Sequence, residues 1–188
     1  RIALRYQPLD TLTLRGSWGQ GFRAPTLDIV GQQPAFGADG VADPQTCIAQ
    51  GQPAGCSTQV TSYTIANPSV LSEQSTQWST GLAWDATDWL NLTLDYYNIE
   101  IEDQLAFFDT AALVNCISGA STNCPPGVSV LPANATPPVP NLGLGVARDP
   151  LSGEILYSQI GYANLGIIET DGVDLGVRTN FDFGAWGG

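Results

Sequence analysis

The chain has 188 residues, with 18 acidic side chains and six basic ones, all Arg, so its net charge is −12 and its pI is near 4.1. Nucleic-acid binding needs a basic stripe that displaces counterions, and this composition excludes it. The sequence also has no His, the commonest general base and metal ligand, so we expect no enzyme, no metal site and no cofactor. It has no Met and opens at Arg1, which favours a mature product or an excerpt over an intact reading frame.

Apolar and polar residues alternate with a period of two in five segments, at 2–6, 11–18, 77–84, 89–97 and 172–181. This period is typical of β-strands with one apolar and one polar face. We expect one face to carry Leu12, Leu14, Leu82, Leu90, Leu92, Leu94, Val173, Leu175 and Val177, and the other to carry Thr13, Arg15, Thr93, Asp95, Asp174 and Arg178.

The connections between these strands alternate between short and very long. The segments 7–10 and 85–88 are turn-sized and rich in Pro and Asp, whereas loops of about fifty residues are expected at 24–72 and 103–155. Within the second loop, a short helix is predicted after Asp109, which is a good N-cap residue. The Pro-rich segment 124–141 is expected to be an ordered coil or a polyproline-like stretch.

Strands joined by short turns at one end and long loops at the other indicate an outer-membrane β-barrel. Trp84 and Trp89 flank the turn at 85–88, Trp186 lies where the next short turn is due, and Tyr96 ends an apolar stretch, as in an interfacial aromatic girdle. A secreted β-sandwich is the alternative, but sandwiches rarely alternate short turns with such long loops. We therefore expect an all-β, partial antiparallel up-and-down transmembrane barrel, with its apolar face toward lipid and its polar face toward the lumen. Five strands cannot close a barrel, so we expect a part of one.

The four Cys residues form two pairs that are close in sequence, in polar stretches rich in Gly and Pro. Neither spacing is that of a zinc site. We expect two disulfides, each within one loop, in an oxidising compartment; four free thiols are the alternative. The expected pairs are Cys47–Cys56 and Cys116–Cys124.

Four stretches in order along the chain resemble the barrel of TonB-dependent outer-membrane receptors. They are LRGSWGQGFRAPTL (14–27), NPSVLSEQSTQWSTGLAW (67–84), WLNLTLDYYNIEIEDQL (89–105) and RDPLSGEI…ANLGIIETDGVDLGV (148–177). Each motif alone is weak, but the four together in order are specific and cover nearly the whole chain.

The resemblance implies a 22-stranded barrel occluded by an N-terminal plug, of which residues 1–188 are about five strands from the C-terminal half, with short periplasmic turns and two extracellular loops. Neither the plug nor its TonB-binding motif is expected in this chain. The implied function is uptake of a scarce nutrient, such as a siderophore or an oligosaccharide, across the outer membrane of a Gram-negative bacterium. The implied partners are the nutrient, outer-membrane lipid and lipopolysaccharide, the plug and the TonB energy-coupling complex. A passive outer-membrane channel or adhesin is the alternative function.

Several residues are candidates for direct roles, each with a structural alternative. Aromatic side chains beside the second loop suit ligand stacking, or else packing of the loop's own interior. The acidic residues where the fourth strand ends suit ligand contact, or else a charged rim. Arg23 suits an ion pair to the plug or to a neighbouring strand, or else a local pair with an acid such as Asp28. The candidates for ligand contact are Phe107, Phe108, Tyr157, Glu100, Glu102 and Asp103, and those for lumen or plug contact are Arg15, Arg23, Asp95 and Arg178.

Acidic side chains dominate the middle of the chain, because eleven of them and no basic residue lie between Ala24 and Ala147. An acidic mouth repels anions. This favours a neutral or cationic ligand, although the same acids also fit solvated loop residues or residues that bind divalent ions at the lipopolysaccharide surface.

Overall fold

The computed structural model describes residues 1–181, and they fall into two compact units. Unit 1 comprises residues 1–22, 74–102 and the segment from 167 onward, and unit 2 comprises residues 23–73 and 103–166. None of the helices described between residues 1 and 181 is long and apolar enough to cross a membrane.

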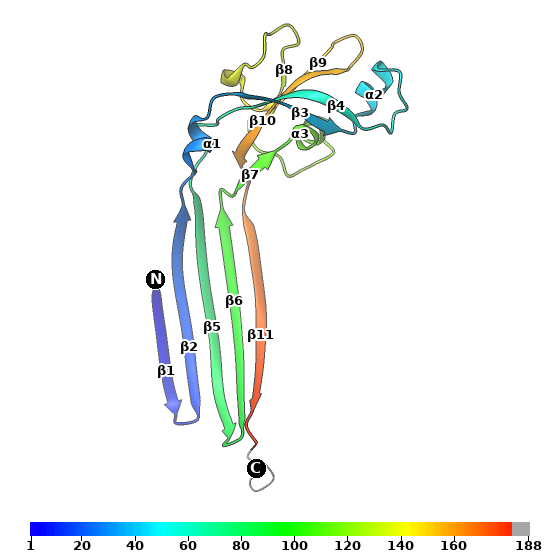
Figure 1. The fold of residues 1–188 in the computed structure, drawn as a ribbon. Coiled ribbons are helices and arrows are strands. Elements are labelled where there is room, and N and C mark those ends of the chain that lie inside the picture. The colour runs from blue at the N-terminus through cyan, green and yellow to red at the C-terminus, as the bar shows by residue number, and fades with distance from the viewer. Residues whose placement is uncertain (182–188) are drawn as a thin grey trace, which may run out of the picture. The chain divides into compact units, whose positions relative to one another are not determined.

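Unit 1 is built on one five-stranded antiparallel sheet, in the order β1-β2-β5-β6-β11 (Figure 1). Its short turns, between β1 and β2 and between β5 and β6, lie at the same end of the sheet (Figure 1). These are the five strands that the alternating pattern predicts. They span Ile2–Leu9 (β1), Leu12–Arg23 (β2), Glu73–Thr87 (β5), Leu90–Glu102 (β6) and Ile168–Thr179 (β11).

The strand register confirms that the two predicted residue sets lie on opposite faces of this sheet. On the apolar face, Leu82 pairs with Leu94, which in turn pairs with Leu175. This face is not covered by a second layer within the described part of unit 1, because Leu4 is 71% exposed and Leu175 is 73% exposed. A β-sandwich buries such residues between two sheets, so the structure favours the open wall of a barrel.

Unit 2 is a folded body made from both segments that the sequence analysis expected as long loops, and these segments contain strands and helices of their own. Its sheet has the order β3-β4-β10-β9-β8, and β7 pairs with β10. Parallel pairing of β4 with β10 joins the first long segment to the second. The strands span Ala35–Val41 (β3), Thr58–Thr64 (β4), Leu105–Phe108 (β7), Ser129–Leu131 (β8), Gly145–Arg148 (β9) and Ile155–Asn164 (β10).

Three short α-helices and one 3-10 helix complete unit 2: α1 (Leu27–Gly31), α2 (Pro44–Ala49), α3 (Thr110–Ile117) and η1 (Pro140–Leu142). The predicted cap is confirmed, because the Asp109 carboxylate accepts a hydrogen bond of 2.8 Å from the Ala112 backbone N–H at the start of α3. The expectation of coil at 124–141 is wrong in part, since this stretch contains β8 and leads into η1.

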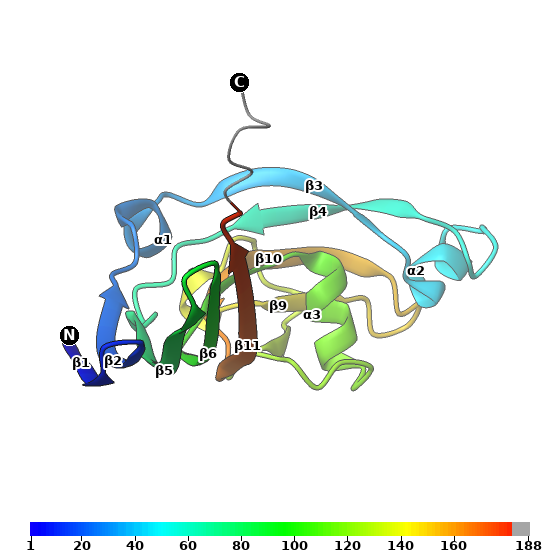
Figure 2. The same cartoon turned by 90° about the horizontal axis from the view of Figure 1, so that it is seen from below.

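The hydrophobic core of unit 2 draws on both long segments. Helix α3 packs beside β9 and β10 (Figure 2). Leu113 of this helix is fully buried. Val60 from the first segment and Val146 and Ile160 from the second belong to the same cluster. Apolar residues 80 or more positions apart thus share one interior, which is why these segments fold instead of remaining loops.

Both predicted disulfides are present, and each lies within one segment of unit 2. Cys47 pairs with Cys56 across a Cα–Cα distance of 5.9 Å, and Cys116 pairs with Cys124 across 5.6 Å. Cys47 lies on α2 and Cys116 lies on α3, so each bond ties a short helix to the coil that follows it.

Candidate functional site

A row of charged side chains crosses the polar face of the unit 1 sheet. The Arg15 guanidinium on β2 donates from Nε to Asp95 Oδ1 on β6 over 2.7 Å, and its second nitrogen contacts Oδ2 of the same carboxylate. Arg5 on β1 pairs in register with Arg15, and Asp174 on β11 pairs with Asp95. The row therefore runs from two cations on one side to two carboxylates on the other.

Gly81 makes this ion pair possible, because β5 lies between the strands that carry Arg15 and Asp95. Gly81 is the register partner of Asp95, and a Cβ atom at this position would overlap the Asp95 carboxylate. The two charged side chains thus meet over a residue without a side chain. The sequence pattern placed Arg15 and Asp95 on one face but gave no sign that the glycine between them matters.

A second charged group holds the two long segments of unit 2 together. Arg148 on β9 donates two hydrogen bonds, of 2.8 and 2.9 Å, to the carboxylate of Asp43, and a third, of 2.7 Å, to the Gly153 carbonyl. Asp43 also caps α2 by accepting from the backbone N–H of Thr46. The hydrogen bonds from Arg148 lower the pKa of Asp43 from 3.8 to about 2, although burial acts in the opposite direction. We call this group the Asp43–Arg148 clamp; sequence reasoning missed it because its two ends lie 105 residues apart.

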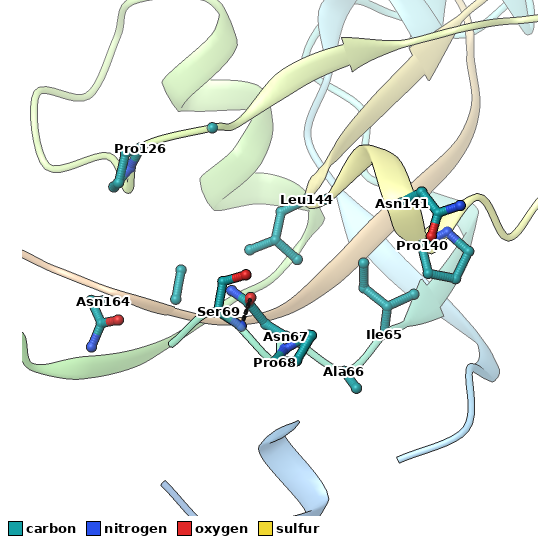
Figure 3. A pocket seen from close by; sticks show the side chains of 13 residues that line it. Ile65, Ala66, Asn67, Pro68, Ser69, Pro126, Pro140, Asn141, Leu144 and Asn164 are labelled. Atoms are coloured by element: carbon teal, nitrogen blue, oxygen red, sulfur yellow. Dashed lines mark hydrogen bonds between the residues drawn. The ribbon is translucent and has the colours of Figure 1, made fainter. Parts of the chain in front are cut away.

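A cleft of about 450 Å³ opens on unit 2 (Figure 3). Its floor is apolar, since Ile65, Leu144 and Ala163 are buried, and its rim carries three exposed prolines. Pro126 lies at one end, and Pro140 and Asn141 lie at the other (Figure 3). No charged side chain lines the cleft. The rim prolines are Pro68, Pro126 and Pro140.

Two asparagines build one wall of this cleft. Asn67 donates from its side chain to the Tyr162 carbonyl over 3.0 Å and accepts from the Ser69 backbone N–H over 3.1 Å. Asn164 binds both backbone groups of Leu71, over 2.7 and 3.1 Å. These amides pin the segment after β4 to the end of β10. Asn67 is the first residue of the stretch 67–84 quoted in the sequence analysis, but its structural role cannot be read from that stretch alone.

Comparison with known families decides what kind of protein carries these features. The family model for TonB dependent receptor-like β-barrels matches residues 1–188. The chain belongs to this TonB-dependent receptor family. The family and its fold are those of outer-membrane receptors and transporters of Gram-negative bacteria, and the resemblance found in the sequence is confirmed.

Several solved receptor structures align with most of this chain at low sequence identity. The siderophore receptor PirA from Acinetobacter baumannii is 14% identical, covers 97% of this chain and 20% of its own, and has a TM-score of 0.48. The ferric enterobactin receptor PfeA from Pseudomonas aeruginosa is 13% identical, with 92% and 18% covered and a TM-score of 0.48. The hemophore receptor HasR from Serratia marcescens, in complex with HasA and heme, is 12% identical, with 95% and 31% covered and a TM-score of 0.36. This chain thus spans a third or less of each of these receptors. A search of curated proteins found no match.

Two of the arginines predicted for lumen or plug contact differ in their surroundings. Arg23 donates a hydrogen bond of 2.8 Å to the Glu73 carboxylate. Glu73 also accepts a hydrogen bond of 2.8 Å from the Leu105 backbone N–H. Arg23 therefore pairs with an acid at the start of β5 rather than with Asp28. Arg178 lies on β11 opposite Asn91 in the strand register.

The acidic candidates lie where β6 ends, in line with other acids on β11. Glu100 pairs in register with Glu169, and Tyr96 donates from its hydroxyl to Asp171 over 3.1 Å. Glu102 is the last residue of β6; Asp103, which follows it, has a positive φ of 55°. Among residues 1–181, no group of three or more His, Cys, Asp or Glu residues is placed to hold a metal ion. A ligand-contact role for Glu100, Glu102 and Asp103 therefore stays a prediction, beside the alternative of a charged rim.

The three aromatic candidates for ligand contact are not equivalent. Phe108 and Tyr157 are only 5% and 3% exposed and belong to the interior of unit 2, as the packing alternative proposed. Tyr157 also donates to the Pro132 carbonyl over 3.1 Å, and burial raises the pKa of its phenol. Phe107 is half exposed and contacts the ring of Tyr162 at a centroid distance of 5.2 Å, so it alone of the three presents a ring to solvent.

The aromatics predicted for a membrane interface lie on unit 1. Trp84 and Trp89 are half exposed beside the turn between β5 and β6, and Trp89 stacks on Phe181 with centroids 5.4 Å apart. Tyr96 packs against Trp78 at 5.2 Å, beyond the Leu82–Leu94 row. Trp186, the remaining member of the predicted girdle, lies outside the described residues.

Proposed function

We propose that this chain is part of an outer-membrane receptor that captures a scarce nutrient and imports it with energy supplied by the TonB complex. The observation that carries the proposal is the family match over residues 1–188. The single-layer sheet of unit 1 supports it, because an exposed row of Leu side chains on one face suits contact with acyl chains.

The two faces of the unit 1 sheet suggest how the chain serves such a receptor. The apolar face meets lipid, and the half-exposed Trp84 and Trp89 meet the membrane surface beside a periplasmic turn. The polar face, with the Arg15–Asp95 pair, faces the lumen and the plug domain of the whole protein. Unit 2 then belongs to the extracellular side, where the nutrient is first bound.

Uptake by the complete receptor in its native host tests this proposal. We expect import of the nutrient to cease when the TonB complex is deleted or when a protonophore collapses the proton gradient. Surface binding to the same cells should persist, since binding at the outside needs no energy. Import that continues unchanged without TonB would contradict energy coupling and favour the passive channel.

A further inference from the structure

The geometry points to an uncharged, hydroxyl-bearing ligand, of the class of short neutral oligosaccharides, bound in the cleft of unit 2. This inference rests on the proposed receptor function and adds the chemical class of the nutrient and the place where it binds. It depends on the charges of unit 2, on the polar groups that line the cleft, and on the cleft's size.

Both cations of unit 2 are already paired with a carboxylate of the same unit. It contains eight acidic residues and two basic ones, Arg23 and Arg148, and the whole chain has neither Lys nor His. Arg148 is engaged by Asp43 and by the Gly153 carbonyl, and Arg23 is engaged by Glu73. Proteins bind anions tightly through charge-assisted hydrogen bonds from Arg or Lys. An anion that is desolvated without such a partner pays its desolvation free energy with no compensating interaction.

The cleft itself offers neutral polar groups above an apolar floor. The Ser69 hydroxyl and the Asn141 side-chain amide can each donate and accept a hydrogen bond, as can each hydroxyl of a sugar. The amides of Asn67 and Asn164 are already used in holding the wall. The floor of Ile65 and Leu144, with the proline rings of the rim, suits the C–H faces of sugar rings.

The size of the cleft also fits a small molecule. Its volume of about 450 Å³ lies in the range of roughly 300–1,000 Å³ that small-molecule sites occupy. Because the Asn67 and Asn164 hydrogen bonds fix one wall and the floor belongs to the core, the cleft exists before a ligand arrives. A preformed site without charged groups disfavours charged ligands, because they would lose hydration there without gaining an ion pair.

Titration calorimetry on the complete receptor in detergent tests the inference with trisaccharides that differ in charge and with one anionic iron chelate. The neutral probes are maltotriose, cellotriose and N-acetylated chitotriose; the cationic probe is deacetylated chitotriose, and the anionic probes are trigalacturonate and ferric citrate. We expect at least one neutral probe to bind at least tenfold more tightly than every charged probe. Binding of no neutral probe, or a preference for a charged one, would overturn the inference.

Substitutions locate the site. Ser69→Trp should fill the cleft and abolish binding of the neutral probe, and Asn141→Ala should weaken it about two- to tenfold through loss of a hydrogen bond. Asn123→Ala is the matched control, because Asn123 is exposed on unit 2 outside the cleft. Heat-modifiable migration on a gel and closed disulfides verify that each variant folds. If Ser69→Trp does not fold, binding of the neutral probe to Asn141→Ala tests the cleft assignment.

The outcomes separate this inference from the receptor proposal. Neutral binding that is unaffected in Asn141→Ala would place the ligand elsewhere and overturn the cleft assignment. Energy-dependent uptake of ferric citrate, equal in all three variants, would overturn the cleft inference and leave the receptor function standing. Uptake that does not need TonB, together with binding of a neutral probe in the cleft of the unsubstituted receptor, would overturn the receptor proposal and leave the cleft inference standing.

Discussion

Replacing Arg148 with Met should release α2 from β9, because the substitution leaves the Asp43 carboxylate buried without its cation. The Arg148 and Asp43 side chains are 21% and 5% exposed, and the two hydrogen bonds between them are 2.8 and 2.9 Å long. Removing one member of a fully buried pair costs about 3–5 kcal/mol. Arg148 is partly exposed, so the cost here should be lower.

The depressed pKa of Asp43 reflects the same hydrogen bonds from Arg148. A fall from 3.8 to about 2 corresponds to about 2 kcal/mol, since one pH unit is worth about 1.4 kcal/mol. Because the pKa in the folded state is depressed, this stability is fully present above about pH 4 and is lost as the pH falls toward 2. We therefore expect Arg148→Met to destabilise the clamp by about 2–3 kcal/mol at neutral pH, or roughly 30- to 150-fold in the local opening equilibrium.

Amide hydrogen exchange on the complete receptor measures that opening. The amide of Cys47 in α2 and the amide of Ile155, which donates to the Thr46 hydroxyl over 3.0 Å, should lose protection by this factor in Arg148→Met. The amide of Leu113 in α3 should keep its protection, as should both clamp amides in the control Arg178→Met. In the unsubstituted protein, the clamp amides should lose protection between pH 4 and 2 after correction for intrinsic exchange.

Equal protection of the clamp amides in Arg148→Met and in the parent at neutral pH would refute the reasoning. Such a result would mean that the shared core and the parallel β4–β10 pairing hold the two segments without help from the ion pair. Loss of protection throughout unit 2, including Leu113, would instead mean that the clamp is required for the whole unit and is not a local fastener.

Three further predictions follow from other contacts. Gly81→Val should push Asp95 away from Arg15 and reduce the heat-modifiable folded fraction at a given temperature, which gel mobility measures; a migration profile equal to that of the parent would contradict the role of the glycine. Asn164→Ala should cost about 1–3 kcal/mol locally and raise amide exchange at Leu71, and an unchanged Leu71 amide would count against the wall assignment. A polypeptide of residues 1–188 alone should aggregate without detergent, because its apolar face is exposed; a monodisperse, cooperatively melting monomer in size exclusion would contradict the barrel interpretation.

The transmembrane-type strands were predictable from the sequence because their signal is local. Alternation through Leu90, Leu92 and Leu94 depends only on neighbouring positions, and so does the cap that Asp109 provides to α3. The disulfides were equally local, since each closes a short loop. Such features need no knowledge of which distant segments meet.

Unit 2 was not predictable in the same way. Its core and the Asp43–Arg148 clamp join residues about a hundred positions apart, and the Pro- and Gly-rich composition of both segments is typical of loops. Tyr157 illustrates the consequence: from sequence it suits a ligand-binding lip, whereas non-local packing encloses its ring between Leu131 and Tyr63. The cleft likewise joins residues 65–69 to segments that begin only at Pro126.

Lipid accessibility along β6 tests the central claim most directly, namely that this chain forms part of a membrane-spanning barrel wall. Single cysteines at positions 92–95 of the complete receptor, labelled with an environment-sensitive dye in liposomes, would be exposed to a lipid-phase quencher. The account predicts quenching at Leu92 and Leu94 and none at Thr93 and Asp95, because successive residues of a strand point to opposite faces. Quenching that is equal at all four positions, or strongest at Thr93 and Asp95, would contradict it.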